Sequence, residues 1–179
     1  MRGIHLALAV LLAGAPAALA GAATVDKPYA GPVAYTPDTE VRLLADLVVI
    51  DKSDRLMTLY SRGKPIAYYR VQLGGVPEGD KVFEGDGRTP EGLYTIDRRN
   101  PRSSFYLSVG LSYPNTADMV RAETAGFEPG GNIFIHGQPN TRPQGMAGDW
   151  TNGCIAVSNE EIREIWMRVP MGTPVAIQP

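Results

Sequence analysis

The sequence of 179 residues contains one cysteine, Cys154, and two histidines, His5 and His136. A single cysteine excludes an internal disulfide, and a structural zinc site generally takes four Cys or His ligands. No His-rich spacing indicates another metal site, so we expect neither a metal nor a cofactor. The formal net charge is −2 and no basic stripe is present, which argues against nucleic acid as a partner.

The chain also has no long apolar run. Its positive start is followed by a brief apolar stretch and then by Ala18-Leu19-Ala20, the small residues that a signal peptidase needs. That stretch is too short for a membrane span of about 20 residues, and no later segment qualifies. We therefore predict a signal peptide over residues 1–20, cleaved near Ala20 or alternatively after Ala22, and export to the periplasm or cell envelope. A flexible leader over 21–44 and one domain over 45–178 should follow, with no membrane span in the mature chain.

Cleavage would remove His5 and leave Cys154 and His136 as the remaining thiol and imidazole. An unpaired thiol in an exported chain indicates a reactive group or an intermolecular bridge. A thiolate is a strong nucleophile, and imidazole is the usual group that generates it. A lone cysteine is, however, more often a small buried hydrophobe. The two residues alone therefore leave a catalytic and a structural role about equally open.

Short strands dominate the expected secondary structure. Apolar and alternating runs bounded by turn residues predict strands over 47–51, 55–60, 66–73, 92–97, 105–110, 132–136, 155–157 and 174–177, with a long loop over 76–90. One helix is expected from about residue 115 to 124. A second follows Ser158, where Glu161 completes a capping box and Pro170 ends the helix. This pattern predicts a mostly β (α+β) fold, a β-sandwich or barrel with one or two packed helices.

Each of the two candidate residues adjoins a glycine. Gly153 permits a sharp bend before Cys154, and the N–H groups of these two residues are candidates for an oxyanion hole. The carbonyl of Gly137 can accept from one imidazole nitrogen of His136 and leave the other facing the thiol. We expect the imidazole within about 4 Å of the sulfur. Asp149 can orient His136, but a turn aspartate usually bonds its own backbone.

These motifs resemble the catalytic domain of the L,D-transpeptidases (YkuD-type) of bacterial cell walls. That family carries a strand ending in His-Gly, a loop, and then Ser-His-Gly-Cys followed by Ile-Arg or a similar pair. Here His136-Gly137 and Gly153-Cys154-Ile155 match, and upstream the strands from Val49 and the turn Thr89-Pro90-Glu91-Gly92 also match. Three positions depart from the pattern, with Thr151 for serine, Asn152 for the second histidine and Ala156 for arginine. The run from Asp149 to Val157 resembles a murein-processing subgroup of the family.

The resemblance implies that Cys154 attacks a stem tetrapeptide of peptidoglycan and that His136 is the general base and acid. A thioester would then pass to an amine from a second stem or from a lipoprotein. It also implies that carbapenems acylate the cysteine. Two alternatives stay open, a hydrolase (an L,D-carboxypeptidase or endopeptidase) and a peptidoglycan-binding module without turnover. Candidates for lining the substrate cleft are Arg88, Tyr113, Arg142, Trp150, Thr151 and Asn152.

Overall fold

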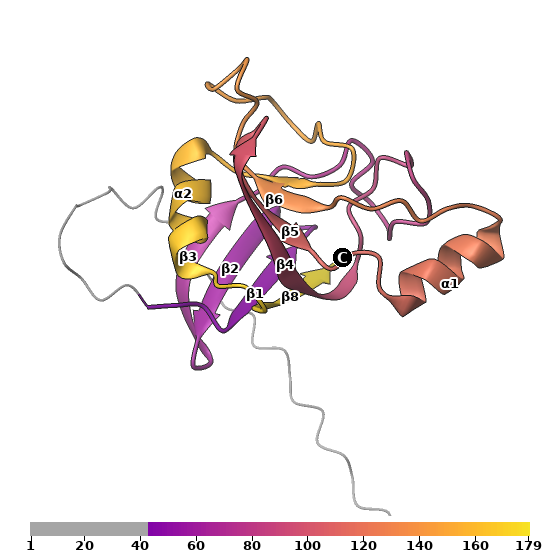
Figure 1. The fold of residues 1–179 in the computed structure, drawn as a ribbon, viewed down its shortest axis with the longest axis horizontal. Coiled ribbons are helices and arrows are strands. Elements are labelled where there is room, and N and C mark those ends of the chain that lie inside the picture. The colour runs from indigo at the N-terminus through magenta and orange to yellow at the C-terminus, as the bar shows by residue number, and fades with distance from the viewer. Residues whose placement is uncertain (1–42) are drawn as a thin grey trace, which may run out of the picture.

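The computed structural model describes residues 43–179, so the predicted signal peptide and nearly all of the predicted leader lie outside the described residues. Eight strands and two helices follow one another along this part of the chain (Figure 1). The elements are β1 (Leu47–Asp51), β2 (Leu56–Ser61), β3 (Lys64–Arg70), β4 (Gly92–Ser103), β5 (Tyr106–Leu111), α1 (Thr116–Ala125), β6 (Phe134–His136), β7 (Ile155–Ala156), α2 (Asn159–Arg168) and β8 (Pro174–Gln178). No helix within residues 43–179 is long and apolar enough to cross a membrane.

The strands form one sheet in the order β3-β2-β1-β8-β4-β5-β6-β7. β1, β2 and β3 are an antiparallel meander, as the alternating runs predict. β4 joins the two halves of the sheet, because its first residues pair with β8 and its later residues pair with β5. Its register shifts between Ile96 and Arg98, and such a bulge bends the strand. The sheet therefore curves around a single apolar core.

The two ends of the sheet meet beyond β3. Gln72 pairs with Ala156 of β7 in an antiparallel bridge, and Gly74 pairs with Thr151 in a parallel one. The first bridge carries backbone hydrogen bonds in both directions, Gln72 N to Ala156 O at 2.9 Å and Ala156 N to Gln72 O at 2.8 Å. These contacts close the curved sheet into a barrel-like form and bring residues 72–74 beside the segment that leads into Cys154.

α2 packs its apolar stripe on the sheet, and the predicted capping box is present. Ser158 Oγ accepts from Glu161 N at 3.2 Å, and Glu161 Oε2 accepts from Ser158 N at 2.8 Å. Ile162 and Ile165 are fully buried against the core. A box of this kind supplies partners for N–H groups that the first turn of a helix leaves free. It therefore sets the start of α2 directly after β7.

α1 lies at the other end of the molecule (Figure 1). Asn115 caps it by accepting from Ala117 N and Asp118 N, and Gly126 ends it with a left-handed backbone at φ 79°. Asp118 is buried and accepts from Tyr94 Oη at 3.0 Å and Arg121 Nη1 at 2.9 Å. Burial of a carboxylate is costly unless it is paired in this way. The Asp118 contacts therefore fix α1 to β4.

The main departure from the predicted elements is the length of β4. The expected strand over 92–97 continues to Ser103 through a polar run that includes Pro101. Proline has no N–H for a ladder, but the register of β4 on β5 shifts between Asn100 and Ser103, so Pro101 stands where no ladder bond is needed. β3 differs in the other direction, since it ends at Arg70 and continues only as the bridges of Gln72 and Gly74.

Candidate active site

Cys154 and His136 lie on the same face of the sheet. His136 is the last residue of β6 and pairs with Ala156 of the parallel strand β7, while Cys154 immediately precedes β7. Side chains alternate between the faces of a strand, so Cys154, two residues before Ala156, shares the face of His136. Ile135 and Ile155 point the opposite way and are fully buried in the core. Strand geometry separates the two Cα atoms by about 8 Å, a span that the histidine and cysteine side chains can bridge.

The His136 imidazole is held by its neighbour and by two aromatic rings. Its Nδ1 lies 2.7 Å from Gly137 O, and a carbonyl can only accept, so Nδ1 carries the proton and Nε2 keeps its lone pair. The ring of Phe105 lies 4.4 Å from the imidazole centroid, and Trp150 meets it edge-on at 5.8 Å. Burial under these rings lowers the pKa of His136, and the Gly137 bond opposes that effect only in part. The group is therefore a neutral imidazole with one basic nitrogen.

The Cys154 thiol is half-buried and faces the backbone of the segment that leads into β6. Its Sγ donates to Asn132 O at 3.5 Å. Burial raises the pKa of the thiol, while the backbone of Phe134 and the charge of Lys81 act in the opposite direction. Among residues 43–179 no hydrogen bond joins Sγ to His136, so the close contact expected from the sequence stays a prediction. The directions of the two pKa shifts favour the neutral form of each group, the thiol of Cys154 and the imidazole of His136.

The turn before the nucleophile is organised by Thr151. Its Oγ1 accepts from Gly153 N at 3.1 Å and donates to Cys154 O at 2.7 Å. In this structure the Gly153 N–H is bonded to a buried hydroxyl, so its service in the oxyanion hole stays a prediction. The Cys154 N–H makes no hydrogen bond within the described part of the chain, and it is the remaining candidate donor.

Gly153 is required by space and by backbone angle. Its φ is +123°, and a Cβ atom there would stand 2.6 Å from Arg88 O. We expect Gly153→Ala to lower the free energy of unfolding by about 2–4 kcal/mol through strain and overpacking. Urea denaturation would measure this loss. Gly131→Ala is the matched control, since nothing lies within 4 Å of its added methyl group, and an equal loss in both variants would contradict the steric argument.

The loop between His136 and Cys154 is fastened by two glutamines. Gln72 Oε1 accepts from Trp150 Nε1 at 3.0 Å and from Gln138 Nε2 at 3.2 Å. Gln72 Nε2 donates to the carbonyls of Met146 and Gly148, and Gln138 Oε1 accepts from Met146 N at 3.0 Å. This network holds the edge of Trp150 against the imidazole. The sequence carries no motif for it, because Gln72 lies 78 positions from Trp150.

The pKa of His136 should respond to its aromatic cover. In Trp150→Ala the imidazole is better hydrated, which favours its charged form, so we expect its pKa to rise towards the ordinary value of about 6.5. Trp150→Phe keeps a ring but loses the bond to Gln72, and its shift should be smaller. Titration of the imidazole by nuclear magnetic resonance measures both, with His136→Gln identifying the signal. An unchanged pKa in Trp150→Ala would show that the indole does not shield the imidazole.

Asp149 neither orients His136 nor bonds the backbone of its own turn. Its Oδ1 accepts from Leu73 N at 2.8 Å, and its Oδ2 accepts from Arg55 Nε and Nη2 at 3.0 and 2.9 Å. The carboxylate thus joins the start of the Cys154 turn to the segment after β3 and to the β1–β2 turn. Within residues 43–179 no hydrogen bond or ion pair links it to His136. The ion pair with Arg55 completes the anchoring of this loop.

The predicted cleft residues divide into those at the site and those outside it. Trp150 and Thr151 contact His136 and the Cys154 turn, as described above, and Asn152 is exposed between them and the nucleophile. Tyr113 belongs to the apolar core and donates its hydroxyl to Pro129 O at 2.8 Å, so it is a core residue and not a cleft residue. Arg88 packs its carbonyl beside Gly153, but its guanidinium donates to Asp80 O at 3.3 Å. Arg142 lies on the exposed loop with its Nη1 near Met146 Sδ.

Three features of the structure agree with a known family. They are the closed sheet, the histidine fixed by the carbonyl of the following glycine, and the cysteine that follows a strained glycine. The YkuD family, the L,D-transpeptidase catalytic domain, matches residues 45–177. The chain belongs to this family. The match begins before β1 and ends in β8, and it includes both Cys154 and His136.

Individual relatives agree with this assignment. YafK, a candidate L,D-transpeptidase of Escherichia coli (strain K12), is 30% identical over 183 residues, which cover 94% of this chain and 64% of YafK. The crystal structure of Pgp2 (K307A mutant) from Campylobacter jejuni, a helical cell shape determining protein, has a TM-score of 0.61 at 29% identity, covering 75% of this chain and 47% of Pgp2. Bd1075 of Bdellovibrio bacteriovorus shares the fold at a TM-score of 0.55 and 24% identity, covering 79% and 50%. The chain thus spans less than two thirds of YafK and about half of Pgp2.

Proposed function

We propose that this chain is an exported peptidoglycan L,D-transpeptidase with Cys154 as nucleophile and His136 as general base and acid. The observation that carries the proposal is the shared face of the two side chains, with Nδ1 of His136 bonded to Gly137 O so that Nε2 is free to accept a proton. The proposed mechanism requires the thiol to turn from Asn132 O towards that nitrogen. Membership of the family supports the reaction class.

In the first half of the reaction, Sγ of Cys154 attacks the carbonyl carbon at the L-centre of the third residue of a stem tetrapeptide. Nε2 of His136 takes the thiol proton and passes it to the nitrogen of the terminal D-alanine, whose C–N bond breaks. The Cys154 N–H is the candidate donor to the oxyanion. A thioester and free D-alanine result.

In the second half, an amine attacks the thioester carbonyl and the C–S bond breaks. His136 takes the amine proton and returns it to the thiolate, which restores the resting pair. The amine comes from a second stem or from a lipoprotein. If water replaces the amine, the same enzyme acts as an L,D-carboxypeptidase.

Incubation of the purified protein with a disaccharide-tetrapeptide, followed by mass spectrometry, tests the proposal. Cross-linked dimers with release of D-alanine are expected. A tripeptide without dimers would replace the transferase by the hydrolase, and an unchanged tetrapeptide would leave only a binding module. For localisation, the expected result is a protein recovered from the cell envelope with an N-terminus after Ala20.

Carbapenems should acylate the same sulfur. A carbapenem contains a strained lactam carbonyl, and attack by Sγ opens that ring to leave a stable thioester on Cys154. Intact-mass spectrometry should show one added carbapenem mass on the wild-type chain and none on Cys154→Ala. An adduct on the alanine variant would place the acylation at another residue and contradict the assignment.

A further inference from the structure

The face of the sheet that carries Cys154 and His136 also carries an arginine that the family motifs do not include. Arg98 of β4 pairs with Gly110 of β5, and Gly110 pairs with Phe134 of β6. One row across the strands therefore runs from Arg98 through Gly110 and Phe134 towards Cys154. The next row pairs Asn100 with Ser108 and Ser108 with His136.

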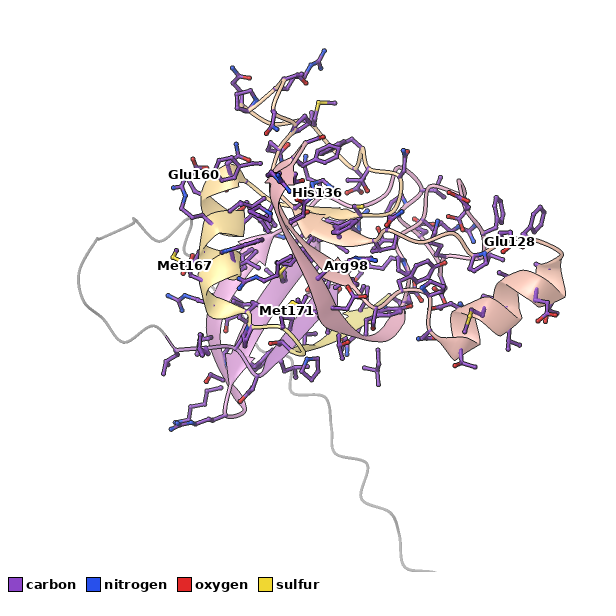
Figure 2. All side chains as sticks on the ribbon, in the orientation of Figure 1. Arg98, Glu128, His136, Glu160, Met167 and Met171 are labelled. Carbon is purple, nitrogen blue, oxygen red and sulfur yellow. The ribbon has the colours of Figure 1, made fainter. Side chains whose placement is uncertain are left out.

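Gly110 lets the arginine lie across its neighbouring strand. A Cβ atom on Gly110 would meet Arg98 Nε at 2.5 Å and Arg98 Cγ at 2.9 Å. The missing side chain thus leaves a channel that the arginine fills, and the Arg98 Cζ atom lies 4.9 Å from the centroid of the Phe134 ring. The guanidinium is thereby carried past β5 and reaches β6, the strand beside Cys154. Figure 2 labels Arg98 and His136 on this part of the sheet.

Some of the N–H donors of the Arg98 guanidinium have protein partners and others do not. Its Nη2 donates to Leu111 O at 3.3 Å, and its Nε forms an ion pair with Asp97 Oδ1 at 3.4 Å that is not a hydrogen bond. Nη1 has no hydrogen-bond partner among the described residues. The side chain is 42% exposed, and that of Asp97 is 36% exposed. An arginine that lies over an aromatic ring and keeps unbonded donors at a solvent-accessible edge is suited to bind a carboxylate.

We propose that Arg98 binds a free carboxylate of the donor stem peptide and so selects donors with that charge. This inference rests on the proposed function, because the donor is the peptide that Cys154 attacks. A stem tetrapeptide carries carboxylates close to the scissile carbonyl, one on the terminal D-alanine and one on the side chain of a diamino acid. Both present the same chemistry to the guanidinium, and the experiment separates them.

Binding to the inactive Cys154→Ala protein tests the inference without turnover. Calorimetry would compare three tetrapeptides, namely the free acid, one amidated at the D-alanine carboxylate and one amidated at the side-chain carboxylate. We expect one amide to bind about 10–100-fold more weakly than the free acid, the range of a charged hydrogen bond. The amide that loses affinity identifies the carboxylate. When Arg98→Gln is added to the Cys154→Ala protein, the affinities for the free acid and for that amide should differ by less than about 2-fold.

Two more variants separate recognition from a general effect of charge or fold. Arg102→Gln removes the same charge from the same strand, and it should retain the full discrimination between acid and amide. Gly110→Ala keeps the arginine but blocks its path, so it should weaken the discrimination, with thermal melting checking the fold. The inference would be overturned if the Cys154→Ala protein bound all three peptides equally. It would also be overturned if Arg98→Gln left the difference in affinity between acid and amide unchanged. If the wild-type chain shows no turnover while the acid and the amide still differ in affinity, the transferase is refuted and the carboxylate site is not.

Discussion

Replacement of Cys154 by alanine is expected to abolish formation of both dimers and tripeptides from a disaccharide-tetrapeptide. The thiol is the one cysteine of the chain, so no second sulfur can take over the nucleophilic step. Removal of a covalent nucleophile typically costs at least about 10³-fold in rate, and more where the site retains no other route. Mass spectrometry of the reaction products would set the limit on residual activity.

The fold should survive this substitution. Cys154 is only half-buried, and its thiol makes only weak polar contacts, to Asn132 O and to the backbone of Phe134, so the loss of stability should stay near 1 kcal/mol or less. Cys154→Ser tests the chemistry more narrowly, because the hydroxyl keeps the shape of the side chain but is a far poorer nucleophile at neutral pH. Turnover of the alanine variant above about 1% of the wild-type rate would remove Cys154 from the mechanism.

Local sequence signals predicted most of the scaffold around the site. The capping box of Ser158 and Glu161 and the apolar stripe of Ile162 and Ile165 are local patterns, and the structure contains both. Strand β1 has the predicted limits because its short apolar run is followed at once by the turn residues Lys52-Ser53-Asp54. Such features depend on neighbours within one or two turns of chain, and for this reason periodicity and turn chemistry are sufficient to find them.

The polar contacts of the site could be predicted from the sequence less well than the scaffold. The Thr151 hydroxyl accepts from Gly153 N in a local turn, a pattern that serine and threonine form often. The sequence therefore contained a signal for this turn, but the prediction gave the turn-forming role to Asp149. Asp149 instead reaches Arg55, 94 positions away. The positions of Gln72 and Arg98 follow from the closure of the sheet and from the register of β4 on β5. A one-residue change of that register would turn Arg98 to the other face.

Replacement of His136 should produce the second large effect, and its pH dependence distinguishes two forms of the mechanism. A general base contributes about 10²–10⁴-fold, and His136→Gln should lower kcat/KM by that factor at neutral pH. Burial lowers the pKa of His136 and raises the pKa of Cys154, so both groups are neutral around pH 7. The proton therefore moves from Sγ to Nε2 during the attack, and an ion pair is not the resting state.

The signs of these shifts predict the pH profile. A lowered pKa keeps the imidazole a competent base to more acidic pH, so the acid limb of kcat/KM should fall below the ordinary histidine value of about 6.5. In His136→Gln that limb should disappear, and the residual rate should rise with pH through the raised pKa of the thiol, above about 8.5. Alkylation of Cys154 by iodoacetamide provides an independent titration of the same thiol. A preformed ion pair would instead give fast alkylation at pH 6 that His136→Gln abolishes, and this result would reverse the assignment of the two protonation states.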